Sequence, residues 1–184
     1  MRLLVAGFGP FGEVRDNPSA RLARSIDGEK TQGVHIIGRE MPVSYRRSVR
    51  CCIDWVKELD VDVVIGVGVA VSRDVVTVER TGVRPLETVE ADVDGLVTFE
   101  SLQDAPAQVH ATIDVDQLAL HLDAVVGDDA GRYVCNAWLY QAVQEIDRKV
   151  GFLHIPPEGL DVQRLLHAIG EMWGERRWQR NSTT

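Results

Sequence analysis

The stretch DVVIGVGVA, residues 62–70, is the segment of this sequence that says most about its fold. Almost all of its residues are apolar, without the alternation expected of a strand that has one face in water. Runs of this kind are typical of central strands in parallel sheets, which helices cover on both faces. The run therefore predicts a buried strand near the middle of a sheet.

Strand-like and helix-like segments alternate on both sides of this run. Further strands are expected over residues 2–8, 34–37, 75–83, 124–126 and 151–155, and helices over 18–26, 44–59, 114–122, 136–149 and 160–173. This alternation predicts an α/β fold, with three α/β/α layers around an open, twisted, mostly parallel sheet. Residues 1–175 are expected to form a single domain, followed by a flexible tail at 176–184.

The composition narrows the possible partners and the location. The chain has 20 basic and 28 acidic residues, a net charge of −8, which disfavours binding to nucleic acid. No apolar stretch approaches the roughly 20 residues that span a bilayer, and the first residues lack the pattern of a signal peptide. The chain has three cysteines, an odd number, and we expect all three to be reduced thiols. We therefore expect a cytoplasmic protein without membrane partners.

Gly7, Gly9 and Gly12 spell G-x-G-x-x-G directly after the first predicted strand, which raises the possibility of a dinucleotide loop. In that motif the following helix begins within the glycines and points its N-terminus at the pyrophosphate. Here the helix signal begins only at Asn17, and Pro10 removes an N–H donor from the loop. A nucleotide-dependent oxidoreductase is therefore the weaker interpretation.

Two aromatic residues of the same loop, Phe8 and Phe11, permit two interpretations. Their rings could close the end of the core, as buried aromatic side chains commonly do. Alternatively, the turn between them could present both rings as a flat apolar clamp for a small ring of a ligand.

Three side chains form a candidate catalytic group. Cys135 lies at the start of a predicted helix, where the helix N-terminus favours a thiolate. His154 lies near the carboxyl end of the last predicted strand, at the sheet edge where open α/β folds bind ligands. Glu79 lies within an apolar strand, where a carboxylate needs a partner. A nucleophile, a base and an orienting carboxylate would suit acyl transfer.

The residues around these positions resemble the pyrrolidone-carboxylate peptidase (pyroglutamyl peptidase I) family of cysteine peptidases. Four motifs carry the resemblance, in the order typical of that family: GFGPFG followed by NPS, VERTGV after VGVAVSR, AGRYVCN, and GFLHIP. The resemblance implies removal of N-terminal pyroglutamate from peptides, with no cofactor. It also implies a homo-oligomer, commonly a tetramer. No metal is expected either, because no pair among the histidines and cysteines has the spacing of metal ligands.

The same resemblance implies roles for individual residues. Cys135 matches the nucleophile, His154 the general base, and Glu79 the carboxylate that orients it. The positions that match the walls around the pyroglutamyl ring are Phe8, Phe11, Val43, Val69, Tyr133 and Val134.

The sequence also departs from the family pattern. Val89 occupies a position where the family commonly has an arginine near the oxyanion, and Arg73 or Arg84 are alternative donors. Loss of one such donor can cost about 10²–10³ in rate. Tyr133 stands where phenylalanine is common, and its hydroxyl could bond to the lactam. Because of these departures, a second interpretation stays open: the protein is an inactive relative that only binds pyroglutamyl or similar N-terminal groups.

Overall fold

The computed structural model describes residues 1–12, 14–84, 90–97 and 105–174. Its main sheet has the strand order β2-β3-β1-β4-β9-β5-β8. These strands are β1 (Arg2–Phe8), β2 (Lys30–Thr31), β3 (Val34–Met41), β4 (Val63–Val69), β5 (Thr77–Glu79), β8 (Val125–Gly127) and β9 (Lys149–Ile155). A second sheet pairs β6 (Thr81–Val83) with β7 (Gln108–His110). The predicted tail at 176–184 falls outside the described residues.

The direction of the strands confirms a mostly parallel sheet. Strands β3, β1, β4 and β9 are parallel neighbours, as the apolar run in β4 predicts for the centre of the sheet. Strands β5 and β8 are parallel to each other, and β5 runs antiparallel to β9. The sheet is therefore mixed at one side of its parallel centre.

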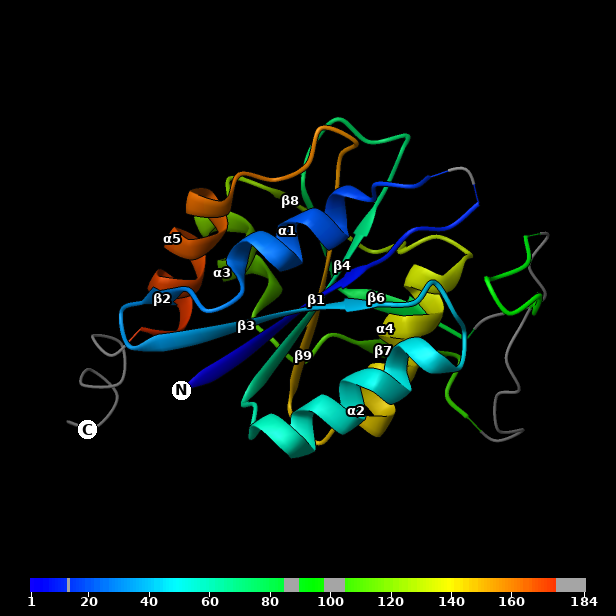
Figure 1. Cartoon of the computed structure of the whole chain (residues 1–184), viewed down its shortest axis with the longest axis horizontal. Coiled ribbons are helices and arrows are strands. Elements are labelled where there is room, and N and C mark those ends of the chain that lie inside the picture. Colours follow the sequence, from blue (N-terminus) through cyan, green and yellow to red (C-terminus); the bar gives the residue numbers. More distant parts are fainter. Residues whose placement is uncertain (13, 85–89, 98–104, 175–184) are drawn as a thin grey trace.

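In the described part of the chain, five helices cover the two faces of this sheet (Figure 1). They are α1 (Pro18–Ile26), α2 (Arg47–Leu59), α3 (Val115–His121), α4 (Val134–Glu145) and α5 (Val162–Trp173). Successive strand residues point to opposite faces. Thus Leu3 joins the core under α1, α3 and α5, whereas Leu4 joins the core under α2 and α4. Two separate cores hold the three α/β/α layers together.

The segment 75–83 differs from the single strand expected there. It forms β5 and β6, which belong to different sheets. The break falls at Arg80, whose N–H donates to the carbonyl of Gly127 at 2.7 Å while its carbonyl accepts from Ala111 N–H at 2.8 Å. The chain thus changes pairing partners immediately after Glu79.

Candidate active site

Cys135 lies in the first turn of α4, as its position before an amphipathic helix predicted. The turn that leads into the helix contains Gly131, with φ +82°, and its N–H donates to the Asp129 side chain at 2.9 Å. A positive φ favours glycine, which lacks a Cβ. This turn lets the chain leave β8 and start α4 with the thiol half-buried at the sheet surface.

Gly68 provides the space that the thiol occupies. A Cβ at this position of β4 would lie 2.7 Å from Cys135 Sγ and 3.1 Å from the ring of Phe152. The absent side chain therefore allows the sulfur to lie directly against the central strand. This role cannot be inferred from the sequence alone, because glycine in a strand has several uses.

Asn136 attaches the start of α4 to strand β6. Its side chain donates to the Val83 carbonyl and accepts from the Val83 N–H, both at 2.9 Å. The side chain is almost completely buried, and most of α4 is buried with it. The helix that carries the thiol is thus bound to β6 and enclosed by the core.

His154 and Glu79 come from the neighbouring strands β9 and β5. In the antiparallel register Thr77 lies opposite His154, so Glu79, two residues further along, is a diagonal neighbour on the same face. Their side chains meet, with His154 Nδ1 at 2.7 Å from Glu79 Oε1. The structure therefore brings together the imidazole and carboxylate that the sequence singled out.

The environment of His154 favours its protonated form. Burial alone would lower the pKa of the imidazole, but hydrogen bonds to Cys135 and Glu79, together with the charges of both partners, raise it to about 9. His154 thus contacts both of the other predicted catalytic side chains. A protonated ring beside the thiol stabilises the thiolate.

Arg73, suggested as a possible oxyanion donor, contacts a different part of the site. Its Nη1 forms an ion pair with Glu79 Oε1, and its Nη2 donates to the Asp129 carbonyl at 2.7 Å. The side chain of Arg84 donates to the Ala105 carbonyl at 3.2 Å. Val89 lies outside the described residues.

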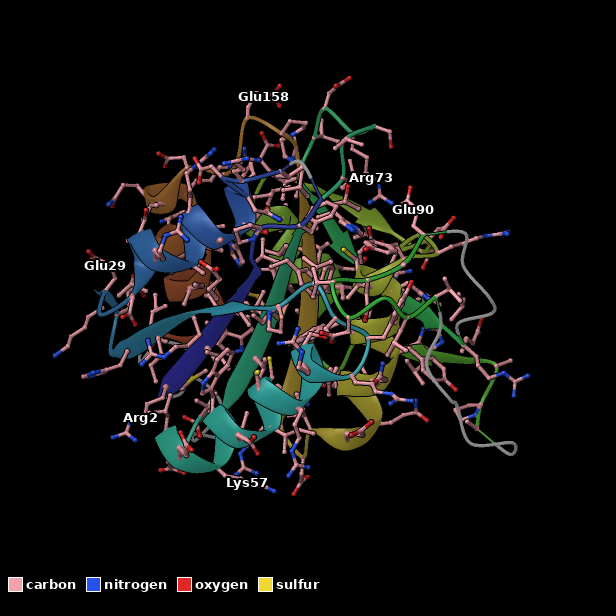
Figure 2. The ribbon with its side chains drawn as sticks, turned by 45° about the vertical axis from the view of Figure 1, so that its right-hand side comes forward. Arg2, Glu29, Lys57, Arg73, Glu90 and Glu158 are labelled. Atoms are coloured by element: carbon pink, nitrogen blue, oxygen red, sulfur yellow. The ribbon has the colours of Figure 1, made fainter. Side chains whose placement is uncertain are left out.

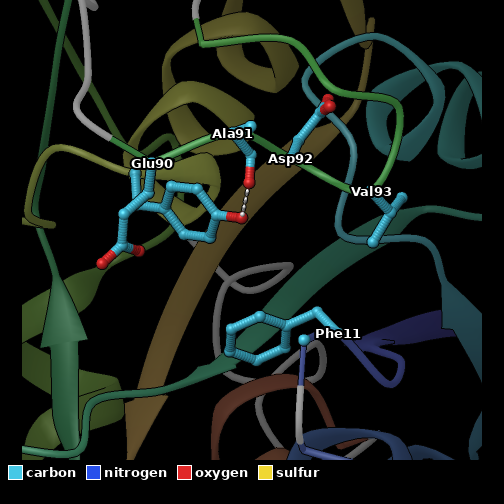
Figure 3. Close-up of a pocket in the computed structure, with 7 residues that line it drawn as sticks. Phe11, Glu90, Ala91, Asp92 and Val93 are labelled. Atoms are coloured by element: carbon cyan, nitrogen blue, oxygen red, sulfur yellow. Dashed lines mark hydrogen bonds between the residues drawn. The ribbon is translucent and has the colours of Figure 1, made fainter.

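A pocket of about 410 Å³ is lined in part by Tyr133, two residues before the thiol in sequence. Its lining also includes Phe11 and the residues 90–93, which lie above Phe11 in Figure 3. The rings of Phe11 and Tyr133 are 6.3 Å apart, and the hydroxyl of Tyr133 donates to the Ala91 carbonyl at 2.9 Å (dashed in Figure 3). The pocket therefore has an aromatic side and a backbone side.

The segment of residues 90–96, here named the wall segment, owes its shape to Asp92. This buried carboxylate accepts N–H bonds from Tyr45, Asp94 and Leu96 at 2.8–2.9 Å. The three bonds fold the wall segment and attach it to the chain before α2. Sequence reasoning missed Asp92, although Asp-Val-Asp-Gly at 92–95 is a turn pattern.

The wall segment has a second attachment through Asp94. Its carboxylate accepts from Ser44 Oγ at 2.6 Å and from Arg47, whose Nη2 and Nε lie 2.6 and 2.9 Å from it. The N–H of Val93 donates to the carbonyl of Val43 at 3.1 Å. Val43 thus contributes a backbone contact to this side of the pocket.

Of the other four predicted wall residues, three are buried and Val69 is partly buried. Phe8 and Val134 are buried in the core under α2 and α4, with the Phe8 ring 6.4 Å from that of Phe152. The side chain of Val43 belongs to the same core. Val69 packs against the opposite core, under α1, α3 and α5. The structure does not gather these four side chains around the pocket, and their binding roles stay predictions.

The other two cysteines lie on α2. Cys52 is fully buried, and burial raises the pKa of its thiol to about 12. Burial also raises the pKa of the half-buried Cys51 thiol. Both thiols are therefore poor nucleophiles at neutral pH.

Among the described residues, no helix is long and apolar enough to cross a membrane. In the same part of the chain, no group of three or more histidine, cysteine, aspartate or glutamate residues is arranged to hold a metal ion.

Comparison with known proteins finds peptidases that resemble this chain in sequence and in fold. The pyrrolidone-carboxylate peptidase of Pyrococcus furiosus is 29% identical over 168 residues, which cover 85% of this chain and 81% of that protein. The enzyme of the same name from Mycobacterium marinum is 32% identical over 170 residues, 84% of this chain and 77% of that protein. The crystal structure of pyroglutamyl peptidase I from Bacillus amyloliquefaciens superposes with a TM-score of 0.83 at 25% identity, covering 93% and 92% of the two chains.

A protein-family model identifies the family to which this chain belongs. The pyroglutamyl peptidase family model matches residues 1–162, which is most of the chain. The chain belongs to the pyroglutamyl peptidase family and is therefore a hydrolase, as the four sequence motifs implied.

Proposed function

We propose that this chain removes N-terminal pyroglutamate from peptides, with Cys135 as nucleophile, His154 as general base and acid, and Glu79 as the group that orients His154. The observation that carries the proposal is the surroundings of His154, which bonds to Glu79 at 2.7 Å and whose pKa the side chain of Cys135 also raises. A base held between a nucleophile and a carboxylate is the arrangement that acyl transfer requires.

The reaction follows from these contacts. The Cys135 thiolate attacks the pyroglutamyl carbonyl carbon and forms a C–S bond. His154 gives its proton to the nitrogen of the leaving amine as the C–N bond breaks. Water then attacks the thioester while His154 accepts its proton, and the C–S bond breaks to release pyroglutamate and restore the thiolate. The proposal needs no cofactor.

The start of α4 supplies donors for the negative charge that develops on the carbonyl oxygen. The first N–H groups of a helix have no acceptor within that helix, and Cys135 lies in the first turn. We infer that the Cys135 N–H and a second donor hold the oxyanion. Arg73 is a poor choice for that donor, because its guanidinium contacts Glu79 and the Asp129 carbonyl.

The pocket that Tyr133 and Phe11 line suits a small, flat ring. Phe11 and Tyr133 supply apolar surface, and the wall segment supplies backbone polar groups. The Tyr133 hydroxyl donates its proton to Ala91, so toward a lactam it can act only as an acceptor, for the ring N–H.

Turnover of a pyroglutamyl amide tests the function directly. Purified protein under reducing conditions is expected to release a fluorescent amine from its pyroglutamyl amide and to leave the prolyl amide intact, because proline lacks the lactam carbonyl. The measurement is the ratio of kcat/KM for the two compounds. Binding of pyroglutamate without turnover would instead support the inactive relative.

The pH dependence of turnover tests the role of His154. The raised pKa, about 9, keeps the imidazole protonated through neutral pH, and its proton is lost as the pH rises through that value. We expect kcat/KM to fall above about pH 9, since a neutral imidazole cannot protonate the leaving amine. Glu79→Gln removes a negative charge that raises this pKa, so the decline should move to lower pH. An unmoved decline in Glu79→Gln would count against the pairing.

We propose further that the protein is cytoplasmic, as its sequence features indicate, and that it forms a homo-oligomer, as the family resemblance implies. The three free cysteines support a reducing compartment. Sedimentation of the purified protein measures its oligomeric state, and a monomer at all concentrations would contradict the second expectation.

A further inference from the structure

Glu79 is held by more than His154. The carboxylate is fully buried, and both His154 Nδ1 and Arg73 Nη1 bond to the same oxygen, Oε1. The other oxygen, Oε2, has no hydrogen-bond partner in the part of the chain that the structure describes. It lies against Gly127, where a Cβ would be 2.5 Å away. All of the polar contacts that orient Glu79 here therefore pass through one oxygen.

Arg73 connects that oxygen to a fixed point of the backbone. Its Nη2 donates to the Asp129 carbonyl at 2.7 Å, in the turn that leads from β8 into α4. Arg73 itself follows a turn after β4, closed by a bond from its N–H to the Ala70 carbonyl at 3.1 Å. Figure 2 shows Arg73 at the end of the molecule away from Arg2 and Lys57. The guanidinium of Arg73, in the loop after β4, thus connects the Glu79 carboxylate to the loop after β8.

The charge of Arg73 matters most when His154 has lost its proton. During the reaction His154 passes its proton to the leaving amine and becomes neutral. If Arg73 were absent, Glu79 would then be a buried anion without a charged partner, which is an unfavourable state in an apolar interior. A guanidinium remains protonated throughout and also fixes the carboxylate with directed N–H donors. Arg73 can therefore hold Glu79 ionised and in place through the whole cycle.

We propose that Arg73 is a positioning residue for the reaction, acting through Glu79 on the orientation of His154. The proposal rests on the catalytic roles given above and adds a fourth side chain to them. Arg73 has no role in binding the pyroglutamyl ring, because its guanidinium is committed to Glu79 and Asp129.

The test is a double-mutant cycle between Arg73 and Glu79. Arg73→Met is expected to lower kcat by roughly 10- to 100-fold with KM nearly unchanged, since misplacing a catalytic group affects the chemical step. Arg73→Lys, which keeps the charge, should recover part of this loss. In a Glu79→Gln background, Arg73→Met should change kcat by less than about threefold, because the interaction is already absent.

A matched control is available one residue beyond Glu79. Arg80 forms an exposed ion pair with Asp116 at 2.7 Å, and Arg80→Met should leave kcat within about twofold of wild type. Equal losses from Arg73→Met in the wild-type and Glu79→Gln backgrounds, or an effect confined to KM, would overturn the proposal. Absence of turnover in the wild type would instead refute the proposed function. Thermal unfolding of each variant identifies a loss that comes from misfolding.

Discussion

Cys135→Ala is expected to abolish turnover of a pyroglutamyl amide, with a loss of at least about 10⁴-fold in kcat. Alanine removes the only atom that forms the covalent bond to the acyl group in the proposed reaction. The fold should persist, because the thiol is half-buried and alanine favours the helix. The measurement is the initial rate of amine release under reducing conditions, with unfolding temperature recorded for each variant.

The neighbouring cysteines provide the control for this substitution. Cys51→Ser, on the half-buried side of α2, and Cys52→Ala, in the core, should both keep most of the activity. Cys52→Ala leaves a small cavity and should lower stability more than it lowers the rate. Comparable losses of turnover in all three variants would mean that the nucleophile has been assigned to the wrong thiol.

His154→Ala should have the second largest effect, with a loss of roughly 10²- to 10⁴-fold in kcat/KM, the range that a general acid–base group contributes. The variant loses both the proton donor for the leaving amine and the cation beside the thiol. Alkylation of Cys135 by iodoacetamide at neutral pH should slow in parallel, because less thiolate is present without the imidazolium. Both rates can be measured on the same preparation.

Two controls distinguish a loss of catalysis in His154→Ala from a loss of folding. His167→Ala changes an exposed residue of α5 and should retain wild-type turnover. Added imidazole should restore part of the activity of His154→Ala, since it can occupy the space left by the ring. Wild-type rates in His154→Ala would rule out its role as acid and base.

The central part of the fold was predictable because its signals are local and strong. The apolar run at 62–70 became β4, and Asn17 followed by Pro18 marked the start of α1, where the Asn17 side chain accepts from Ser19 N–H. Boundaries set by tertiary contacts were not predictable in this way. The helix expected at 136–149 ends at Glu145, because β9 takes up Lys149 in pairing with Val63.

The catalytic side chains of the candidate site could be predicted from the sequence, but the residues that position them could not. Cys135, His154 and Glu79 each stood in an unusual local setting, and the contacts of His154 unite them. The role of Gly68 depends on which helix crosses the strand at that point, which only the assembled fold determines. The same holds for Arg73, which lies in the loop after β4 and whose partner is six residues further along the chain, on β5.

The wall segment has two attachments that differ in their response to ionic strength. The ion pair between Asp94 and Arg47 is open to water, with side-chain exposures of 32% and 55%, and concentrated salt screens such pairs over about 3 Å at 1 M. The carboxylate of Asp92, which accepts from backbone N–H groups, is buried and is little affected by dissolved ions. Concentrated salt should therefore weaken the attachment of the wall segment at Asp94 much more than its attachment at Asp92.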